Sequence, residues 1–301
     1  MKLIAPSYYK KFKCIADKCK HSCCVGWEID VDEKTDEYYK TVGGELGKRL
    51  SQNIDRSTEP SHFKLSADER CPFLNRNGLC DIISALGEGA LCQICADHPR
   101  YRNFYSDRTE IGLGLCCEAA AELILKTEEK TTLEVLSDDG EDDETDIEDE
   151  IFYGVREKIF SIVQNRGKRM KDRIDDLICE FDLSMPERSP SEWASDFLTL
   201  EMLDSAWGIM LERLKEYTYL PQYENEVECE QLLIYFIYRQ LADGIYDGRL
   251  NERIKLAILS LNMILSISEA CKMPLFEVAR AYSSEIEYSE ENIETLLDIL
   301  Q

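Results

Sequence analysis

The sequence lacks the features that would carry a chain into or across a membrane. It contains no apolar run long enough to span a bilayer. Its first residues, "MKLIAPSYYKKFKC", include lysines but no continuous apolar core and no small-residue cleavage site. A secretory signal peptide is therefore not predicted, and we expect a cytoplasmic protein that does not act on membranes.

Two common sequence signatures for nucleotide-derived cofactors are also missing. The stretch "GGELG" at residues 43–47 is a weak match to a glycine-rich nucleotide loop, because no strand is predicted before it. Radical enzymes that use S-adenosylmethionine carry C-x3-C-x2-C, whereas here Cys19 and Cys23 are followed directly by Cys24. Neither signature identifies a cofactor pocket.

Basic residues are scarce, with 35 Lys and Arg against 60 Asp and Glu and a net charge of −25. Residues 1–134 carry only −3 of this charge, and residues 137–301 carry −22. Such a chain repels nucleic acid and anionic membrane surfaces, so neither is an expected partner. A basic partner or a lysine-bearing substrate is compatible with it, although solubility is the simpler explanation.

The acidic run "SDDGEDDETDIEDE" divides the sequence into two expected domains. Residues 137–150 contain ten acids and one apolar residue, which predicts a solvated linker between residues 1–136 and residues 151–301. After it, apolar residues recur at helical spacing in residues 151–164 and in three longer stretches, residues 191–217, 228–246 and 252–270. Ser191 is the expected N-cap of the second stretch.

The part before the acidic run has mixed signals. Residues 71–82 predict a hairpin that turns at Asn75–Gly78, and residues 103–115 predict another that turns near Ser106 and Asp107. Residues 84–98 predict a helix that Pro99 ends, and a further helix begins at Cys116. The expected fold is mainly α: a small cysteine-rich α+β N-terminal metal domain followed by an all-helical C-terminal domain.

Cysteine is concentrated in the N-terminal part of the chain. Of thirteen cysteines, Cys179, Cys229 and Cys271 stand alone in helical stretches and are expected to fill the core. The other ten are clustered, and the three histidines (His21, His62 and His98) lie among them: Cys14, Cys19, Cys23, Cys24, Cys71, Cys80, Cys92, Cys95, Cys116 and Cys117. Without sign of export, such clusters indicate metal binding or catalysis rather than disulfides.

Local structure gives the clustered thiols a reason to meet. Cys71 and Cys80 lie on facing arms of the first hairpin, and Cys92 and Cys95 share one face of the predicted helix. Cys116 and Cys117 stand at a strand-to-helix turn, where a helix N-terminus favours thiolates. These positions predict a metal site rather than buried free cysteines.

The metal is less clearly indicated than the site. Zinc usually takes two C-x2-C knuckles, and only Cys92 and Cys95 form one, although His98 is spaced to complete a site. Iron–sulfur clusters take four thiolates at irregular spacing, and ten thiols suffice for one cluster or two. We favour iron and keep zinc as the alternative.

Four segments of the sequence resemble the bacterial flagellin lysine-N-methylases and the wider group of cysteine-rich domains described as zinc- or iron-chelating. The resemblance covers residues 10–126. It rests on four segments in this order: "FKCIADKCKHSCCVGWEIDVD", "RCPFLNRNGLCDI", "LCQICADHPRYRN" and "GLGLCCEAAAELIL".

The resemblance assigns the matching residues to the motifs of that family. Its opening cluster is matched by Cys14, Cys19, Cys23 and Cys24, and its "CPFL…G-x-C" segment by Cys71 and Cys80. Its later segments are matched by Cys95, Pro99 and Arg100 and by Cys116 and Glu118. Cys117 departs from the pattern, because many members have proline there, so Cys116 is the stronger of the two candidates.

The resemblance implies a protein lysine N-methyltransferase that transfers a methyl group from S-adenosylmethionine to flagellin lysines and carries a four-iron four-sulfur cluster. An aromatic ring can steer an amine or a sulfonium, and Trp27, Tyr101, Phe104 and Tyr105 are candidates for which ordinary packing is the simpler interpretation. Arg100 either holds a carboxylate or forms a structural ion pair. The sequence identifies neither a catalytic base nor a donor pocket.

A non-catalytic function is the alternative. In it, the cysteine-rich part is a zinc- or iron-binding interaction module, and the acidic helical part docks a basic partner. The missing donor motif favours this interpretation, whereas the number and order of the matching segments favour the enzyme.

Overall fold

Residues 13–101 and the rest of the chain form separate units in the computed structural model, which describes residues 1–140, 144–217 and 219–301. We call residues 13–101 the cysteine-rich unit. Residues 1–12 together with residues 102–301 are the main unit. The chain is 53% helical and 11% strand, so the predicted mainly-α class is confirmed.

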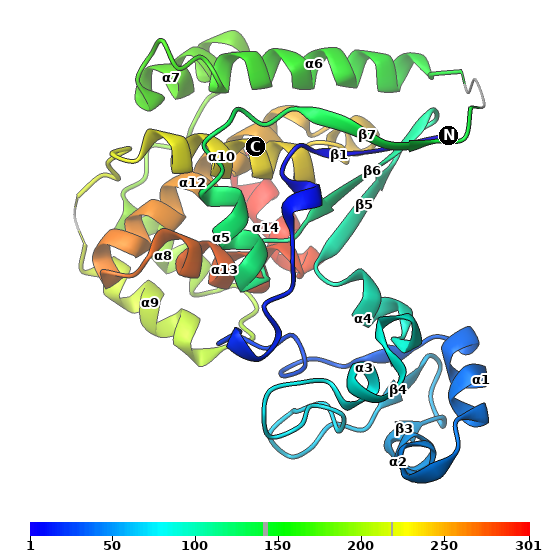
Figure 1. The fold of residues 1–301 in the computed structure, drawn as a ribbon. Helices are drawn as coiled ribbons and strands as arrows, with labels where there is room; N and C mark the ends of the chain where they lie inside the picture. Colours follow the sequence, from blue (N-terminus) through cyan, green and yellow to red (C-terminus); the bar gives the residue numbers. More distant parts are fainter. Residues whose placement is uncertain (141–143, 218) are drawn as a thin grey trace. The chain divides into compact units, whose positions relative to one another are not determined.

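The main unit contains a four-stranded sheet in the order β5-β6-β1-β7 (Figure 1). Its strands are β1 (Lys2–Pro6), β5 (Arg100–Phe104), β6 (Arg108–Leu113) and β7 (Leu133–Asp138), and the unit boundary falls within β5, after Tyr101. The first strand, β1, runs parallel to β6 and antiparallel to β7. In the predicted hairpin between β5 and β6, Tyr105 N donates to Arg108 O at 2.9 Å. The second hairpin prediction is thus confirmed.

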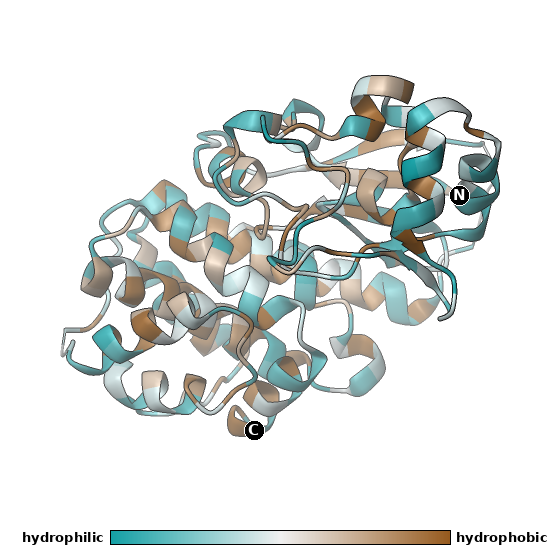
Figure 2. Cartoon of the chain, turned by 90° about the horizontal axis from the view of Figure 1, so that it is seen from below, coloured by the Kyte–Doolittle hydropathy of each residue, from teal (hydrophilic) through white to brown (hydrophobic). Residues whose placement is uncertain are grey.

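Helices make up the rest of the main unit (Figure 1). They are η1 (Tyr9–Lys11), α5 (Glu118–Leu125), α6 (Ile147–Val163), α7 (Met170–Glu180), α8 (Pro190–Phe197), α9 (Ser205–Lys215), α10 (Glu226–Gln240), α11 (Gly244–Asp247), α12 (Leu250–Cys271), α13 (Leu275–Tyr282), the π-helix η4 (Ser283–Glu287) and α14 (Glu290–Ile299). Figure 2 shows hydrophilic and hydrophobic segments along them, as expected for amphipathic helices.

The boundaries of the two units differ from the expected domains. Strand pairing explains the difference, because β1 joins the N-terminus to β6 and β7, so the sheet and the helices share one unit. Regular elements also take in both ends of the acidic run: β7 extends to Asp138, and α6 begins at Ile147. Asp149 is buried and accepts hydrogen bonds from Ser106 N and Oγ at 2.7 and 2.6 Å. Residues 141–143 of the predicted linker lie outside the described residues.

The helical stretches are confirmed, with two interruptions. Residues 191–217 form α8 and α9, and residues 228–246 lie in α10 and α11. On α6, Ile151 begins the apolar pattern predicted over residues 151–164, but its side chain is 62% exposed and does not join the buried face. Arg156 is buried on that helix, because it donates two hydrogen bonds to the Glu110 carboxylate of β6 at 2.6 and 2.7 Å.

The start of α8 corrects the expected N-cap. Ser189, not Ser191, caps the helix, and its hydroxyl accepts from Glu192 N while the Glu192 carboxylate accepts from Ser189 N. Pro190 then occupies the first helical position, where a missing N–H costs nothing. Ser191 instead donates to Lys215 O at 2.8 Å.

Helix α12 is the longest apolar element of the chain. By length and composition it could cross a membrane, with a mean hydropathy of 1.5 over its most apolar window, so the expectation that no such run exists was wrong. However, 72% of that window is buried inside the protein. It contacts α9, α10 and α13, as a core helix does.

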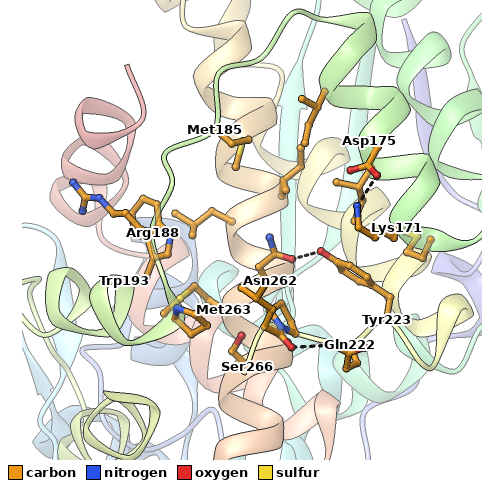
Figure 3. A pocket seen from close by; sticks show the side chains of 18 of the residues that line it. Lys171, Asp175, Met185, Arg188, Trp193, Gln222, Tyr223, Asn262, Met263 and Ser266 are labelled. Carbon is orange, nitrogen blue, oxygen red and sulfur yellow. Dashed lines mark hydrogen bonds and ion pairs between the residues drawn. The ribbon is translucent and has the colours of Figure 1, made fainter. Parts of the chain in front are cut away.

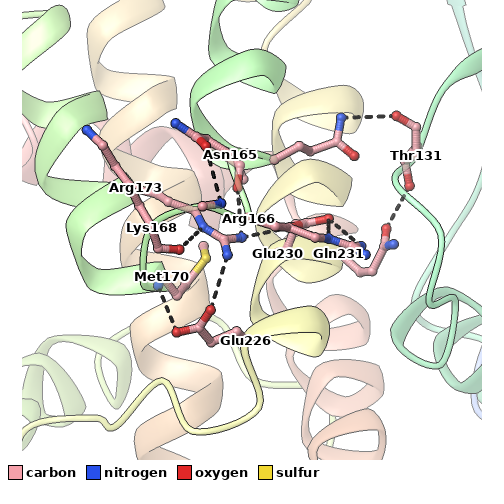
Figure 4. Close-up of polar contacts among 12 residues, drawn as sticks. Thr131, Asn165, Arg166, Lys168, Met170, Arg173, Glu226, Glu230 and Gln231 are labelled. Carbon is pink, nitrogen blue, oxygen red and sulfur yellow. Dashed lines mark hydrogen bonds and ion pairs between the residues drawn. The ribbon is translucent and has the colours of Figure 1, made fainter.

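A buried ion network joins α10 to α7 and to the segment between α6 and α7 (Figure 4). Arg173 and Arg166 both donate to the Glu230 carboxylate at 2.8 Å, and Arg173 also donates to Glu226 at 3.1 Å. Arg173 is 1% exposed and Glu230 is fully buried. The Glu230 carboxylate is thus paired with two arginines, and removal of either partner would leave a buried charge less compensated.

The cysteine-rich unit is built from short elements. They are η2 (Ala16–Lys18), β2 (Asp30–Val31), α1 (Glu33–Thr41), α2 (Gly44–Asn53), β3 (Ile54–Asp55), β4 (Ser61–Phe63), α3 (Asp81–Leu86), η3 (Glu88–Ala90) and α4 (Gln93–Asp97). Its sheet has the order β2-β4-β3. Tyr39, Phe63 and Phe73 pack in its core, with the last two rings 5.0 Å apart between centroids.

Two glycines decide the local structure around the cysteines of this unit. Gly78 has a φ of 75° at the predicted hairpin turn, which closes with a bridge between Leu74 and Cys80. That hairpin prediction is confirmed. Gly87 has a φ of 86° and interrupts the helix expected over residues 84–98. The segment therefore forms α3, η3 and α4, and Pro99 follows the last of them.

Candidate metal centre

Five thiols gather in the core of the cysteine-rich unit. Cys71 and Cys92 are 7% and 1% exposed and belong to its buried cluster. Cys24, Cys80 and Cys95 pack against that cluster and are partly buried. We call these five residues the thiol core. They come from three separate segments of the chain, so the fold brings together cysteines that are distant in sequence.

Backbone pairing places the first three members of the thiol core. Cys71 N donates to Cys24 O at 2.8 Å, next to an antiparallel bridge between Val25 and Arg70. Cys80 follows the hairpin turn and is the N-cap residue of α3. Cys24, Cys71 and Cys80 are thus held by strand-like pairing and a turn rather than by one helix.

Cys92 and Cys95 meet in a different way from the expected one. Because Gly87 ends α3, Cys92 is the N-cap residue of α4, with extended backbone, and Cys95 lies in the first turn. The expectation that both share a helix face was therefore wrong for Cys92. The two thiols still form a hydrogen bond with each other.

The pKa values show that charges in the thiol core would influence one another. Burial, with a smaller contribution from negative charge on Cys24, Cys80 and Cys92, raises the pKa of Cys71 to about 12. The hydrogen bond between Cys92 and Cys95 lowers the pKa of the first and raises that of the second. A bound cation is the usual means by which several such thiols become thiolates together.

Cys24 has the most acidic thiol of the core. A hydrogen bond from Cys23 lowers the pKa of Cys24 to about 7, against the opposing effect of burial. Arg70 lowers the same pKa through its charge. Cys23 thus acts on the thiol core although its own side chain is exposed.

Cys14 and Cys19 lie in the same unit but on more exposed backbone. Cys14 is exposed, and its Sγ accepts from Ala16 N at 3.4 Å. Cys19 is half-buried and donates from Sγ to His21 O at 3.2 Å. Their place in a metal centre stays a prediction.

Cys116 and Cys117 belong to the main unit. They stand between β6 and α5, as the strand-to-helix prediction requires, with Cys117 as the N-cap residue. Cys116 Sγ donates to Tyr288 Oη at 3.1 Å, and burial raises the pKa of Cys116 to about 11. Their expected role as ligands stays a prediction. Of the isolated cysteines, Cys229 is buried, Cys271 is half-buried and Cys179 is exposed, so core filling holds fully only for Cys229.

Within the described residues, no three His, Cys, Asp or Glu side chains already stand in an arrangement that would hold a metal ion. His98, the predicted alternative ligand for zinc, is half-buried, and its desolvation lowers its pKa to about 4. Arg100 donates to Ala96 O at 3.2 Å, which agrees with a structural role for that residue.

The thiol core also involves two residues that the sequence did not single out. Tyr39 donates to Ala90 O at 2.7 Å; burial raises its pKa, and charge on Cys92, Cys95 or Cys80 would raise it further. Asp32 caps α1 through Thr35 N at 3.0 Å and also accepts from Gln93 N, at the start of α4, at 2.8 Å. From the sequence, only the helix-capping pattern at Asp32 could have indicated one of these contacts, the hydrogen bond from Thr35 N to Asp32.

The candidate aromatic residues divide between the two units. Trp27 packs against the core that contains the thiols, and its Nε1 donates to Cys23 O at 2.6 Å. Tyr105 packs on Phe152 in the main unit, with ring centroids 5.5 Å apart. Phe104 is 69% exposed. Trp27 is thus the candidate ring that the structure places beside the cysteines.

The structure defines a mainly-α protein with a small unit in which five cysteines share one core. The chain is 30% identical, over 126 residues and 40% of its length, to proteins named Lysine-N-methylase from Salmonella typhimurium (strain LT2) and Salmonella choleraesuis. It is equally identical over 126 residues to the Flagellar biosynthetic protein FliU of Salmonella muenchen, 75% of which is covered. The chain therefore belongs to the family of lysine-N-methylases and FliU, and the family prediction is confirmed.

The extent of these matches differs between the relatives. The matched region spans 31% of the length of each Lysine-N-methylase. No protein-family profile and no solved structure matches the chain.

Proposed function

We propose that this protein is a cytoplasmic, S-adenosylmethionine-dependent lysine N-methyltransferase that acts on flagellin and carries an iron–sulfur cluster in its cysteine-rich unit. Membership of the lysine-N-methylase family is the observation that carries the proposal. The name of the FliU relative adds a link to the flagellum. The thiol core supports the cofactor.

The donor set of the thiol core fits an iron–sulfur cluster in its chemistry. A four-iron four-sulfur cluster takes four thiolates, and the core offers five cysteines of soft, polarisable sulfur in a partly dry environment. Cys24, Cys71 and Cys80, with Cys92 or Cys95, would hold such a cluster. When bound, the cluster supplies a redox-active centre and neutralises buried thiolates.

Methyl transfer sets a clear demand on the substrate lysine. The neutral ε-amine attacks the methyl carbon of the sulfonium, so an N–C bond forms and the S–C bond breaks. The thioether S-adenosylhomocysteine leaves, and the proton lost by the amine passes to a base or to water. Because only the neutral amine is nucleophilic, the site must desolvate the lysine or accept its proton.

The negative charge of the chain suits a lysine-bearing substrate. A net charge of −25 attracts basic segments over long range and raises their association rate at low salt. Methyl transfer should therefore slow as ionic strength rises, mainly through weaker substrate binding. A rate that does not depend on salt would remove this support.

The direct test is co-expression with flagellin followed by mass spectrometry of its lysines. We expect methyl-lysine with the wild-type protein and little or none with Cys71→Ala. Cys179→Ala, in an exposed position of α7, is the matched control and should methylate as the wild type does. Unmodified flagellin with fully metal-loaded wild-type protein would contradict the proposal.

A second candidate function is a non-catalytic metal-binding module that docks a basic partner. It is favoured by the limited share of each Lysine-N-methylase that the match covers. Retention of S-adenosylmethionine separates the two functions, because the module alone has no need of the donor. Metal-loaded protein that binds flagellin but neither retains the donor nor methylates lysine would establish the second.

A further inference from the structure

The main unit contains a cavity of about 600 Å³ that takes no part in the thiol core (Figure 3). It lies among α7, the start of α8, the segment before α10 and the middle of α12. Its volume falls within the range of about 300–1,000 Å³ typical of small-molecule sites. Apolar side chains contribute much of its lining, among them Ile174, Met185, Trp193 and Met263.

Two polar groups on the core helix α12 face this cavity one helical turn apart. Asn262 Oδ1 accepts from Tyr223 Oη at 2.7 Å, but its amide nitrogen has no partner among the described residues. Ser266 is 1% exposed, and no hydrogen bond to its hydroxyl is found in the described part of the chain. Figure 3 shows both side chains among those that line the cavity.

A third polar residue of α12 shows what a satisfied group looks like on this helix. Ser260 is fully buried, donates to Leu256 O at 2.7 Å and lies 2.7 Å from Tyr282 Oη. Buried polar groups are nearly always paired in this way, because an unpaired one costs free energy. Asn262 and Ser266 differ from Ser260: neither is among the described buried atoms that lack a partner, and both line the cavity, where solvent or a ligand can reach their polar groups.

The charges around the cavity argue against an anionic ligand. Each of the three basic side chains in the lining already has an acidic partner. Lys171 pairs with Asp175 at 2.6 Å, and Arg188 pairs with Asp196. Arg169 pairs with Asp172 at 3.1 Å. A phosphate or carboxylate would have to displace these partners, whereas an uncharged ligand would not.

We propose that this cavity binds an uncharged small organic molecule with a flat apolar body and a carbonyl or amide edge. The apolar body packs against Trp193 and the methionine side chains. The polar edge accepts hydrogen bonds from the Asn262 amide and the Ser266 hydroxyl, which gives both groups the partner they lack. This binding site is separate from the thiol core and independent of the proposed methyl transfer.

Prodan is a suitable probe, because it is uncharged and flat, has one carbonyl acceptor, and emits at shorter wavelength in apolar surroundings. Titration of the full chain should give a saturable blue shift with one site per chain. Anilinonaphthalene sulfonate is a fluorescent probe of similar apolar character that carries a negative charge. It should bind at least about tenfold more weakly, because the three basic side chains of the lining are already paired with acids.

Two variants test the location. Ser266→Ile places extra methyl groups on the cavity wall and should weaken prodan binding by at least about tenfold. Asn262→Leu removes the free amide and should weaken it by about three- to tenfold, the effect of one hydrogen bond. Ser161→Ile, at an exposed site on α6 outside the cavity, is the matched control and should bind as the wild type does.

The same titrations can overturn the proposal. Absence of saturable binding to the wild type, or undiminished binding in both cavity variants, would place the probe elsewhere and sink it. Anilinonaphthalene sulfonate that binds as tightly as prodan and is lost in the same variants would refute the uncharged class. Circular dichroism checks folding, and if Ser266→Ile does not fold, the half-buried Asn262→Leu decides the location alone.

Discussion

The two units of this chain bury different kinds of side chain. The main unit rests on long helices such as α10 and α12, with aliphatic and aromatic cores and paired buried charges such as Arg173 and Glu230. The cysteine-rich unit has strands of two or three residues and short helices, and cysteines occupy part of its core. Small units seldom bury enough apolar surface for stability, and a metal commonly supplies the remainder. If the cysteine-rich unit holds a metal as proposed, we expect its stability to depend on that metal far more than the stability of the main unit does.

Metal removal should have the largest effect and should separate the units. After anaerobic treatment with a chelator, we expect amide hydrogens in residues 13–101 to exchange nearly as in an unfolded chain, because metal binding and folding are coupled. Amides of α10 and α12 should keep their protection and serve as the internal control. Equal protection of amides in both units after complete metal loss would show that the two units do not differ in their dependence on metal.

Single cysteine substitutions should have the next largest effect on bound metal and on stability. Cys71→Ala and Cys92→Ala remove buried members of the thiol core, so each should lose most of the bound metal and lower the stability of the cysteine-rich unit by roughly 3 kcal/mol or more. Cys95→Ala should act in the same direction. Metal analysis of purified variants provides the measurement.

Cys14 and Cys19, which lie outside the thiol core, make the test of the ligand assignment more specific. Cys14→Ala and Cys19→Ala are also expected to lose metal, since the family resemblance includes both, whereas Cys179→Ala should not. Equal metal content in all of these variants would refute the ligand assignment. Loss with Cys71→Ala but not with Cys14→Ala would confine the site to the thiol core.

Substitution of Arg173 should destabilise the main unit without affecting metal. Arg173→Met leaves the buried Glu230 carboxylate with one partner fewer, which typically costs about 3–5 kcal/mol. Thermal unfolding should show the loss, while iron or zinc content stays that of the wild type. Arg169→Met, in an exposed pair, is the control and should leave the melting temperature almost unchanged.

The smallest expected effect distinguishes the two serines at the start of α8. Ser189→Ala removes the capping box and should destabilise the main unit by about 1 kcal/mol. Ser191→Ala should have a smaller effect, because only its bond to Lys215 O is lost. Urea unfolding can measure both, and the reverse order would show that the cap assignment is wrong.

Local features could be predicted from the sequence, and contacts between distant segments could not. The hairpin at Gly78 and the helix after Cys117 depend on residues close in the chain, and both are confirmed. The unit boundary depends on β1, whose pairing with β6 spans more than a hundred residues and leaves no local signal. In residues 84–98 a single glycine, Gly87, ends α3, and Cys92 is therefore the N-cap residue of α4 instead of a residue inside one continuous helix.

The thiol core shows the same division. Spacing alone indicated a metal site and paired Cys71 with Cys80 and Cys92 with Cys95. It did not show that Cys24 lies against Cys71, because that contact requires backbone pairing between separate segments. Tyr39 was missed because an aromatic residue on an amphipathic helix looks like any other core residue.

The most direct test of the central claim is analysis of anaerobically purified protein for iron, acid-labile sulfide and zinc, together with its visible spectrum. Our account predicts a brown protein with about four iron and four sulfide per chain, or about eight of each if a second cluster forms. A colourless protein with about one or two zinc per chain would contradict the iron–sulfur assignment and favour the non-catalytic module.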